Sequence, residues 1–120
     1  AFGPTREAAR LETSKRFAKQ LMLDAGVPTA RATFHTDVAS ARAAVRALGA
    51  PVVVKASGLA AGKGVIVART VEEAEAAVDD MLVANRFGDA GAEVLVEECM
   101  TGDELSLFFL TDGHVAVALP

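Results

Sequence analysis

The stretch PVVVKASGLAAGKGVIVA, residues 51–68, has two β-branched runs on either side of a segment rich in glycine and alanine. Valine and isoleucine favour strands, so residues 51–56 and 64–68 are predicted strands. Because glycine tolerates positive φ and has no Cβ, the connection between them can bring several backbone N–H groups onto a phosphate. Lys55 and Lys63 would add positive charge there. Taken alone, the same segment also fits a flexible hairpin.

This glycine-rich connection is not a Walker A loop. Only three residues separate Gly58 from Gly62. The residue after Lys63 is Gly64 rather than Ser or Thr, and a strand follows where a Walker A loop would open a helix. Any phosphate contact would therefore be of another class.

The flanking sequence predicts helices and further strands around these two strands. Apolar residues at spacings of three and four predict helices, and β-branched runs predict strands. The expected elements are helices over 11–25, 37–48 and about 70–84, and strands over 30–34, 51–56, 64–68 and 93–97. Thr70 and Glu73 have the spacing of a capping box at the start of the third helix. Strand-like runs on both sides of Asp112-Gly113 predict a β-hairpin.

The order of these elements predicts an α+β fold. From residue 30 to 97 the order is β-α-β-β-α-β, the split pattern of two helices packed on one face of a small mixed sheet. Residues 1–29 form a lead-in segment with one helix, and the hairpin lies beyond the unit, in residues 98–120.

Composition excludes several classes of protein. The chain has 120 residues, of which 52% are hydrophobic and 23% charged, an ordinary globular balance. Its formal net charge of -4 argues against a protein that tracks a nucleic-acid backbone. Cys99 is the single cysteine, so we expect no intramolecular disulfide, no cysteine metal cluster, and a reducing, cytoplasmic setting. We also expect no membrane span.

A second informative segment, VEECMTGDE at residues 96–104, follows the last strand of the unit. A strand that ends and turns can present a backbone C=O and N–H side by side, the complement of the amino group and N1 of adenine. The side chains of Val54, Val65, Val67 and Met100 could form the faces of an adenine slot, although core packing is the commoner role of strand valines. The acidic residues of the segment are equally compatible with a solvated charge run.

Residues 55–65, KASGLAAGKGV, together with FGDAG at 87–91, resemble the phosphate loop of the ATP-grasp family in the form found in glycinamide ribonucleotide synthetases. The resemblance covers essentially the whole chain. Ser57 is a departure, because many relatives carry Asp at this position. The resemblance implies that residues 30–97 are the ATP-grasp lid subdomain, and that 98–120 are the hinge and the truncated start of the second subdomain.

The resemblance also implies roles for individual residues. Lys15 and Lys55 would contact the nucleotide phosphates, together with the loop residues Ser57, Gly58, Gly62, Lys63 and Gly64. Without the family match, Lys15 would be taken for a solvated surface lysine.

At the hinge, the resemblance assigns the base and the ribose. Glu97 and the Glu98 carbonyl would accept from the adenine amino group, and the Met100 N–H would donate to N1. Glu104 would bind the ribose hydroxyls with its carboxylate, while Cys99 would matter only through its backbone.

The activity implied is ATP-dependent ligation of glycine to 5-phosphoribosylamine in purine biosynthesis, through glycyl phosphate, with release of ADP and phosphate. Mg²⁺ is implied as well, with its ligands outside this chain, and the chain alone is expected to be inactive. One alternative is another ATP-grasp carboxylate–amine ligase or carboxylase. The other is a non-catalytic β-α-β-β-α-β binding module such as an RNA reader, which the absence of Tyr and Trp disfavours.

Overall fold

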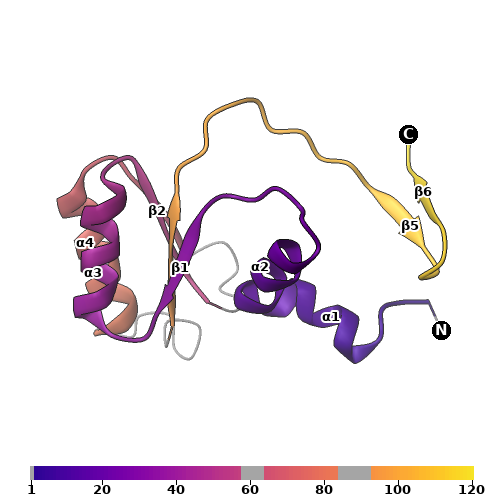
Figure 1. Cartoon of the computed structure of the whole chain (residues 1–120), viewed down its shortest axis with the longest axis horizontal. Coiled ribbons are helices and arrows are strands. Elements are labelled where there is room, and N and C mark those ends of the chain that lie inside the picture. Colours follow the sequence, from indigo (N-terminus) through magenta and orange to yellow (C-terminus); the bar gives the residue numbers. More distant parts are fainter. Residues whose placement is uncertain (1, 58–63, 84–92) are drawn as a thin grey trace.

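A computed structural model describes residues 2–57, 64–83 and 93–120 of the chain (Figure 1). It confirms the α+β class and the β-α-β-β-α-β order. The elements are α1 (Arg6–Thr13), α2 (Lys15–Asp24), β1 (Ala32–His35), α3 (Val38–Leu48), β2 (Val52–Ala56), β3 (Val65–Ala68), α4 (Val71–Leu82), β4 (Val94–Glu98), β5 (Phe109–Thr111) and β6 (Ala116–Ala118). We call residues 32–98 the sheet unit.

The four strands of the sheet unit lie in the order β1-β4-β2-β3, and every neighbouring pair is antiparallel. The expectation of a mixed sheet is therefore wrong. Each β-α-β crossover does join two strands that run the same way, β1 to β2 and β3 to β4. A third strand of opposite direction lies between the members of each pair, so no two parallel strands are hydrogen-bonded to each other.

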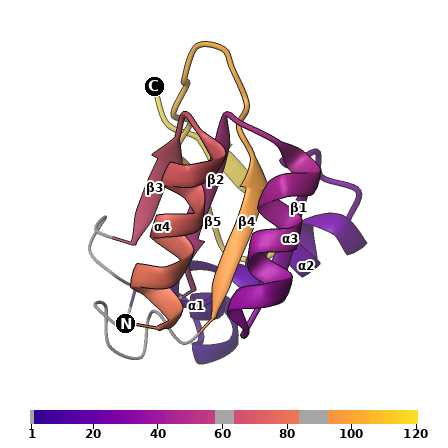
Figure 2. The same ribbon diagram turned by 90° about the vertical axis from the view of Figure 1, so that its left-hand side faces the viewer.

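Helices α3 and α4 cover one face of this sheet (Figure 2). The core forms between them and the strand residues of that face, because period-2 alternation sends every second side chain to the helices. Among the described residues, Met81 on α4 is the largest side chain that is fully buried. The other fully or nearly buried members are Ala41, Val45, Val52, Val54, Ala56, Ala68, Ala74, Ala77, Val78, Val94 and Val96.

Side-chain caps explain where these two helices begin. Asp37 accepts a hydrogen bond from the Ser40 N–H (2.8 Å) at the start of α3. Thr70 accepts one from the Glu73 N–H (3.1 Å) at the start of α4, as the predicted capping box requires. The reciprocal bond is displaced by one residue, because the Glu73 carboxylate accepts from the N–H of Arg69 rather than of Thr70.

The N-terminal segment contains two helices, so the prediction of one continuous helix over 11–25 is wrong. Ser14 ends α1 and begins α2, with an extended backbone at φ -130° and ψ 108°. Its hydroxyl accepts from the Phe17 N–H at 3.2 Å. Serine favours caps over helix interiors because its side chain competes for backbone groups, which a periodicity argument does not weigh. Lys15 thereby becomes the first residue of α2.

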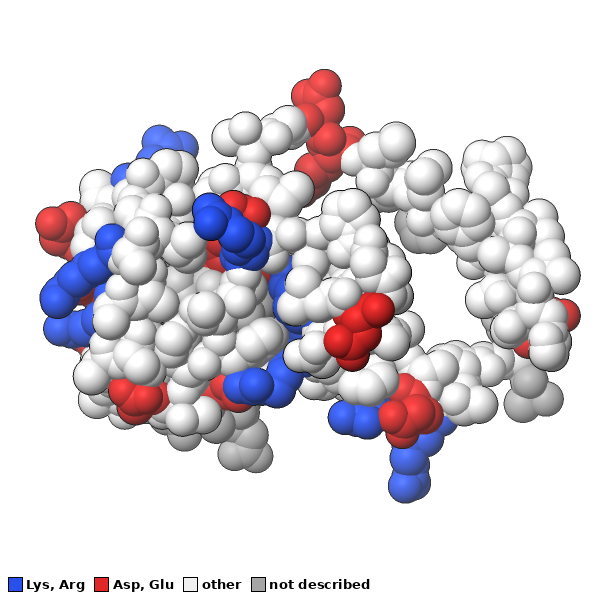
Figure 3. Space-filling view, viewed as in Figure 1, with Lys and Arg blue, Asp and Glu red and all other residues white. Residues whose placement is uncertain are grey.

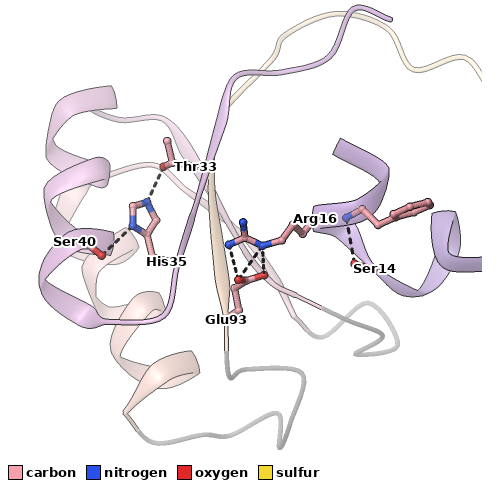
Figure 4. A network of polar contacts seen from close by, with 7 residues as sticks. Ser14, Arg16, Thr33, His35, Ser40 and Glu93 are labelled. Carbon is pink, nitrogen blue, oxygen red and sulfur yellow. Dashed lines mark hydrogen bonds and ion pairs between the residues drawn. The ribbon is translucent and has the colours of Figure 1, made fainter. Parts of the chain in front are cut away.

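Helix α2 lies on the side of the sheet away from α3 and α4 (Figure 1). Arg16 attaches it there, with its Nε and Nη2 donating to the Glu93 carboxylate at 3.1 and 2.6 Å (Figure 4). The same guanidinium lies 4.4 Å from the centre of the Phe34 ring, on β1. The sheet is thus layered between α2 on one side and α3 with α4 on the other.

The hairpin β5–β6 confirms the turn predicted at Asp112-Gly113. Asp112 Oδ1 accepts from the N–H groups of His114 and Val115, both at 2.9 Å, and Gly113 adopts φ 94°, which favours glycine. The hairpin presents exposed apolar side chains, and its surface in Figure 3 is largely uncharged. In the described part of the chain, no helix has both the length and the apolar character needed to span a membrane.

Candidate functional site

The face of the sheet opposite α3 and α4 carries the candidate site. Strand register places on this face Val53 and Lys55 from β2, Leu95 and Glu97 from β4, and Val65 and Val67 from β3. Helix α2 covers part of it, and Leu95 is only 2% exposed. The β3 side is open, with Val65 38% and Val67 56% exposed. Val65 and Val67 therefore form an open apolar strip on the same face as Lys55 and Glu97.

The expectation that Val54 forms a face of an adenine slot is wrong. Val54 is fully buried in the core with α3 and α4. Its neighbour Val53 lies instead on the face opposite α3 and α4, because successive strand residues point to opposite sides of the sheet. Val65 and Val67 lie on the same face as Val53, and their contact with adenine stays a prediction.

Glu97 lies at the centre of a cluster of charged side chains, here called the charged group, which also contains Lys15, Lys19 and Lys55. It is buried, and each carboxylate oxygen accepts from one lysine: Oε1 from Lys55 Nζ at 2.8 Å and Oε2 from Lys19 Nζ at 2.9 Å. Burial raises the pKa of this carboxyl, but the hydrogen bonds from Lys55 and Lys19 outweigh it, so the net pKa lies below the ordinary value. Glu97 is therefore ionised at neutral pH.

Sequence reasoning missed Lys19. It is buried on α2 and also donates to Thr29 Oγ1 at 2.6 Å and to the Ala30 carbonyl at 2.9 Å. A signal was present, because Lys15 and Lys19 have the i, i+4 spacing that places two side chains on one face of a helix. Spacing alone gives no sign that the second lysine is buried.

Lys15 lies at the N-terminus of α2, half-buried and close enough to Lys55 to interact with it electrostatically. Burial, and then the charge of Lys55, lower the pKa of Lys15 below its ordinary value. Like charges held near each other repel, so this pair is set to gain from an anion between its members. The structure thus brings together Lys15, Lys55 and Glu97 from three separate elements.

The glycine-rich loop is described only at its two ends. The Ser57 N–H donates to the Glu93 carbonyl at 2.8 Å, and the Gly64 carbonyl accepts from the Ala56 N–H at 2.6 Å. These bonds fix where the loop leaves β2 and enters β3. Gly58, Gly62 and Lys63 lie outside the described residues.

The residues expected to form the hinge follow at the end of β4. The Glu98 carboxylate accepts from the Arg31 N–H at 2.8 Å and from its Nε at 3.2 Å, so this side chain already has partners within the protein. Cys99 is half-buried with a free thiol. Met100 is 69% exposed, and Glu104 is exposed on the extended segment that leads to β5.

A second polar cluster belongs to the turn between β1 and α3 (Figure 4). His35 lies between Ser40 Oγ, 3.0 Å from its Nδ1, and Thr33 Oγ1, 2.7 Å from its Nε2. Burial lowers the pKa of His35. The described residues contain no group of three His, Cys, Asp or Glu side chains that could hold a metal ion.

The family model for the phosphoribosylglycinamide synthetase ATP-grasp (A) domain matches residues 13–120. The chain belongs to this family. The ATP-grasp match includes α2, the sheet unit and the hairpin, and so all the elements that supply the charged group.

Relatives of this ATP-grasp chain include two bacterial phosphoribosylamine–glycine ligases. The protein from Xylella fastidiosa is 56% identical over 118 residues, covering 98% of this chain and 27% of its own length. The protein from Streptococcus pneumoniae is 52% identical over 120 residues, covering 100% of this chain and 29% of its own. This chain therefore spans less than a third of these relatives.

A solved structure shows the same fold. The crystal structure of phosphoribosylamine–glycine ligase from Thermotoga maritima superimposes with a TM-score of 0.92 at 34% sequence identity. The match covers 99% of this ATP-grasp chain and 30% of that one.

Proposed function

We propose that the chain is the ATP-binding part of a longer ligase, here called the parent enzyme, which joins glycine to 5-phosphoribosylamine in purine biosynthesis. The family match and the names of the relatives support this function. One structural observation carries it: Lys55 pairs with the ionised Glu97 beside the open apolar strip, and Lys15 lies close enough to Lys55 to interact with it electrostatically. That combination offers charge for phosphates and a flat surface for a base.

The reaction has two steps. A carboxylate oxygen of glycine attacks the γ-phosphorus of ATP, the bond to the bridging oxygen breaks, and ADP leaves. The amine of phosphoribosylamine then attacks the carbonyl carbon of glycyl phosphate, loses a proton and displaces phosphate. Transfer of this kind depends mainly on positioning and on neutralising phosphate charge. Lys15 and Lys55 would supply that charge, with the N–H groups of the loop residues Ser57, Gly58, Gly62 and Gly64 and the ammonium of Lys63.

The adenine would lie on the strip formed by Val65 and Val67, at the end of β4. Glu97 and the Glu98 carbonyl would accept from its amino group, and the backbone of Cys99 and Met100 would place a donor at N1. Because the Glu98 carboxylate already binds Arg31, its role rests on the backbone carbonyl. Glu104 would bind the ribose hydroxyls. In this arrangement residues 30–97 are the lid, residues 1–29 lead into it, and 98–120 are the hinge and the start of the second subdomain.

Mg²⁺ supplies charge neutralisation between phosphates when it is bound in phosphoryl-transfer enzymes. The described residues do not fit it, because they bring no suitable carboxylate group together. We propose that its ligands lie in other parts of the parent enzyme and that the enzyme is cytoplasmic.

Purified parent enzyme provides the test. ADP formation should require both glycine and phosphoribosylamine, and Lys55→Met should abolish it in a folded protein. Turnover with bicarbonate or another carboxylate in place of glycine would instead assign the chain to a different ATP-grasp ligase or carboxylase.

A further inference from the structure

Lys19 has used all of its hydrogen-bonding capacity inside the protein. Its side chain is buried, and its ammonium donates to Thr29 Oγ1 (2.6 Å), to the Ala30 carbonyl (2.9 Å) and to Glu97 Oε2 (2.9 Å). An ammonium has three N–H groups, and these three acceptors match them. Lys19 therefore has no donor left for a ligand, so any effect on a ligand must pass through the groups that it holds.

The most consequential of these groups is Glu97, which Lys19 shares with Lys55. Each lysine pairs with one carboxylate oxygen, so the negative charge of Glu97 is shared between Lys19 and Lys55. Removing the Lys19 charge would leave the buried carboxylate with Lys55 as its single ion-pair partner among the described residues. Lys55 would then be held more strongly by Glu97, and the group would carry one positive charge less for an incoming anion.

Lys19 also fixes the position of α2. Its bonds to Thr29 and Ala30 attach the helix to the chain that enters β1, while its bond to Glu97 attaches it to β4. Lys15 lies one turn earlier on the same helix. The distance between Lys15 and Lys55 thus depends on an attachment made by Lys19.

From this geometry we propose that Lys19 is a positioning residue of the nucleotide site. It divides the charge of Glu97 between two lysines, which leaves Lys55 able to turn to a phosphate, and it holds Lys15 on the same side. The inference rests on the proposed function, since it assumes that Lys55 binds ATP phosphate.

A double-mutant cycle in the parent enzyme tests this role, with ATP dissociation constants measured by calorimetry at neutral pH. Lys19→Met should weaken ATP binding by about tenfold or more, the size expected for a charge-assisted contact. In the Glu97→Gln background the same change should cost several-fold less, because there is no longer a carboxylate to recapture Lys55, and only the loss of the bonds to Thr29 and Ala30 remains. Arg46→Met is the matched control, since it removes a cation from the Glu75 ion pair (2.6 Å) on the helical side of the unit.

A pH profile separates positioning from simple structural support. In Lys19→Met, Glu97 keeps its burial but loses one counter-ion, so its pKa should rise. ATP binding by this variant should then strengthen as the pH falls through the raised pKa of Glu97, because protonation of Glu97 releases Lys55. The wild-type protein should lack this strengthening over the same pH interval. A variant that merely packs badly would follow the wild-type profile at lower affinity.

Equal losses from Lys19→Met with and without the Glu97 carboxylate would overturn the proposal, as would full ATP affinity in folded Lys19→Met protein. If that variant does not fold, Lys19→Gln makes the same comparison, since it keeps a donor but drops the charge. Lys55→Met separates this failure from that of the proposed function. If Lys55→Met binds ATP normally, the nucleotide site itself is misplaced. If Lys55→Met is weak but the cycle shows no coupling, only the role of Lys19 fails.

Discussion

Lys55 on β2 and Glu97 on β4 are diagonal neighbours across the sheet, with Lys55 Nζ 2.8 Å from Glu97 Oε1. Lys55 is partly exposed, whereas Glu97 is buried, so the lysine can exchange this partner for a phosphate more readily than the carboxylate can move. The pair thus keeps a cation in place while the site is empty of ligand.

Lys55→Met in the parent enzyme should weaken ATP binding by about ten- to a hundredfold, because a charge-assisted phosphate contact is worth about 1.5–3 kcal/mol. Calorimetry measures the change. From the sequence, the mid-helix residue Lys19 would look like a neutral control position, but it is buried against Glu97 and is therefore unsuitable. Arg46→Met serves as the control instead. If Arg46→Met weakened ATP binding as much as Lys55→Met, Lys55 would not belong to the site.

Glu97 makes the free energy of unfolding depend on pH in the acidic range. Its pKa in the folded protein lies below the ordinary value of 4.5, so its contribution is present above that value and is lost as the pH falls through the folded pKa. Glu97→Gln should destabilise the parent enzyme at neutral pH by on the order of 3 kcal/mol, since it leaves two lysines without a counter-charge.

Urea unfolding at a series of pH values checks this prediction. The difference in free energy of unfolding between wild type and Glu97→Gln should shrink as the solution becomes acidic. Exposed Glu7 pairs with Arg10 on the surface of α1, so Glu7→Gln is the control and should give a small difference. A Glu97→Gln difference that stays constant down to strongly acidic pH would contradict the linkage.

The sheet unit followed from the sequence because its signals are local. Runs of valine gave β2 and β4, and Asp37 and Thr70 capped the helices at the expected positions. Strand pairing is not local, so the expected mixed sheet was wrong: whether β4 inserts between β1 and β2 depends on contacts far apart in the chain. Residues 58–63, most of the predicted phosphate loop, lie outside the described residues, and the roles assigned to them stay predictions.

The charged group was predicted only in part. Lys15, Lys55 and Glu97 were identified through the family resemblance, and the structure brings them together. Burial of Lys19 could not be predicted, because it depends on Ser14 breaking the N-terminal segment into two helices and on α2 then packing across β4. Lysine is rarely buried unless it is paired, and its partner Glu97 is 78 positions away in the sequence.

The two faces of the sheet should respond differently to the truncation of valine to alanine, which removes two carbon atoms. Val54→Ala should lower the free energy of unfolding by about 2 kcal/mol, because it removes buried apolar groups from the core and leaves a cavity. Val67→Ala, at a position 56% exposed, should change stability by less than about 0.5 kcal/mol. If Val67 lies against adenine, the Val67→Ala substitution should nevertheless weaken ATP binding.

Thermal unfolding and calorimetry of both variants in the parent enzyme measure the two effects separately. Val83→Ala is the control for an exposed valine, since Val83 is 69% exposed at the end of α4 and lies outside the proposed site. Val67→Ala protein with unchanged affinity would show that the open strip does not bind the base.

The last prediction concerns the hinge, where the proposed contact of Met100 uses its backbone N–H rather than its side chain. Met100→Leu keeps the side-chain volume at a position 69% exposed and should leave ATP affinity nearly unchanged. Met100→Pro removes the donor and fixes φ, so it should weaken ATP binding in a protein that still folds. Since a strand end that pairs with the amino group and N1 of adenine meets the reversed pattern in guanine, GTP should bind at least about tenfold more weakly than ATP. Calorimetry with both nucleotides on both variants separates these effects. Equal affinity for the two bases, or full ATP affinity in folded Met100→Pro protein, would place the adenine elsewhere.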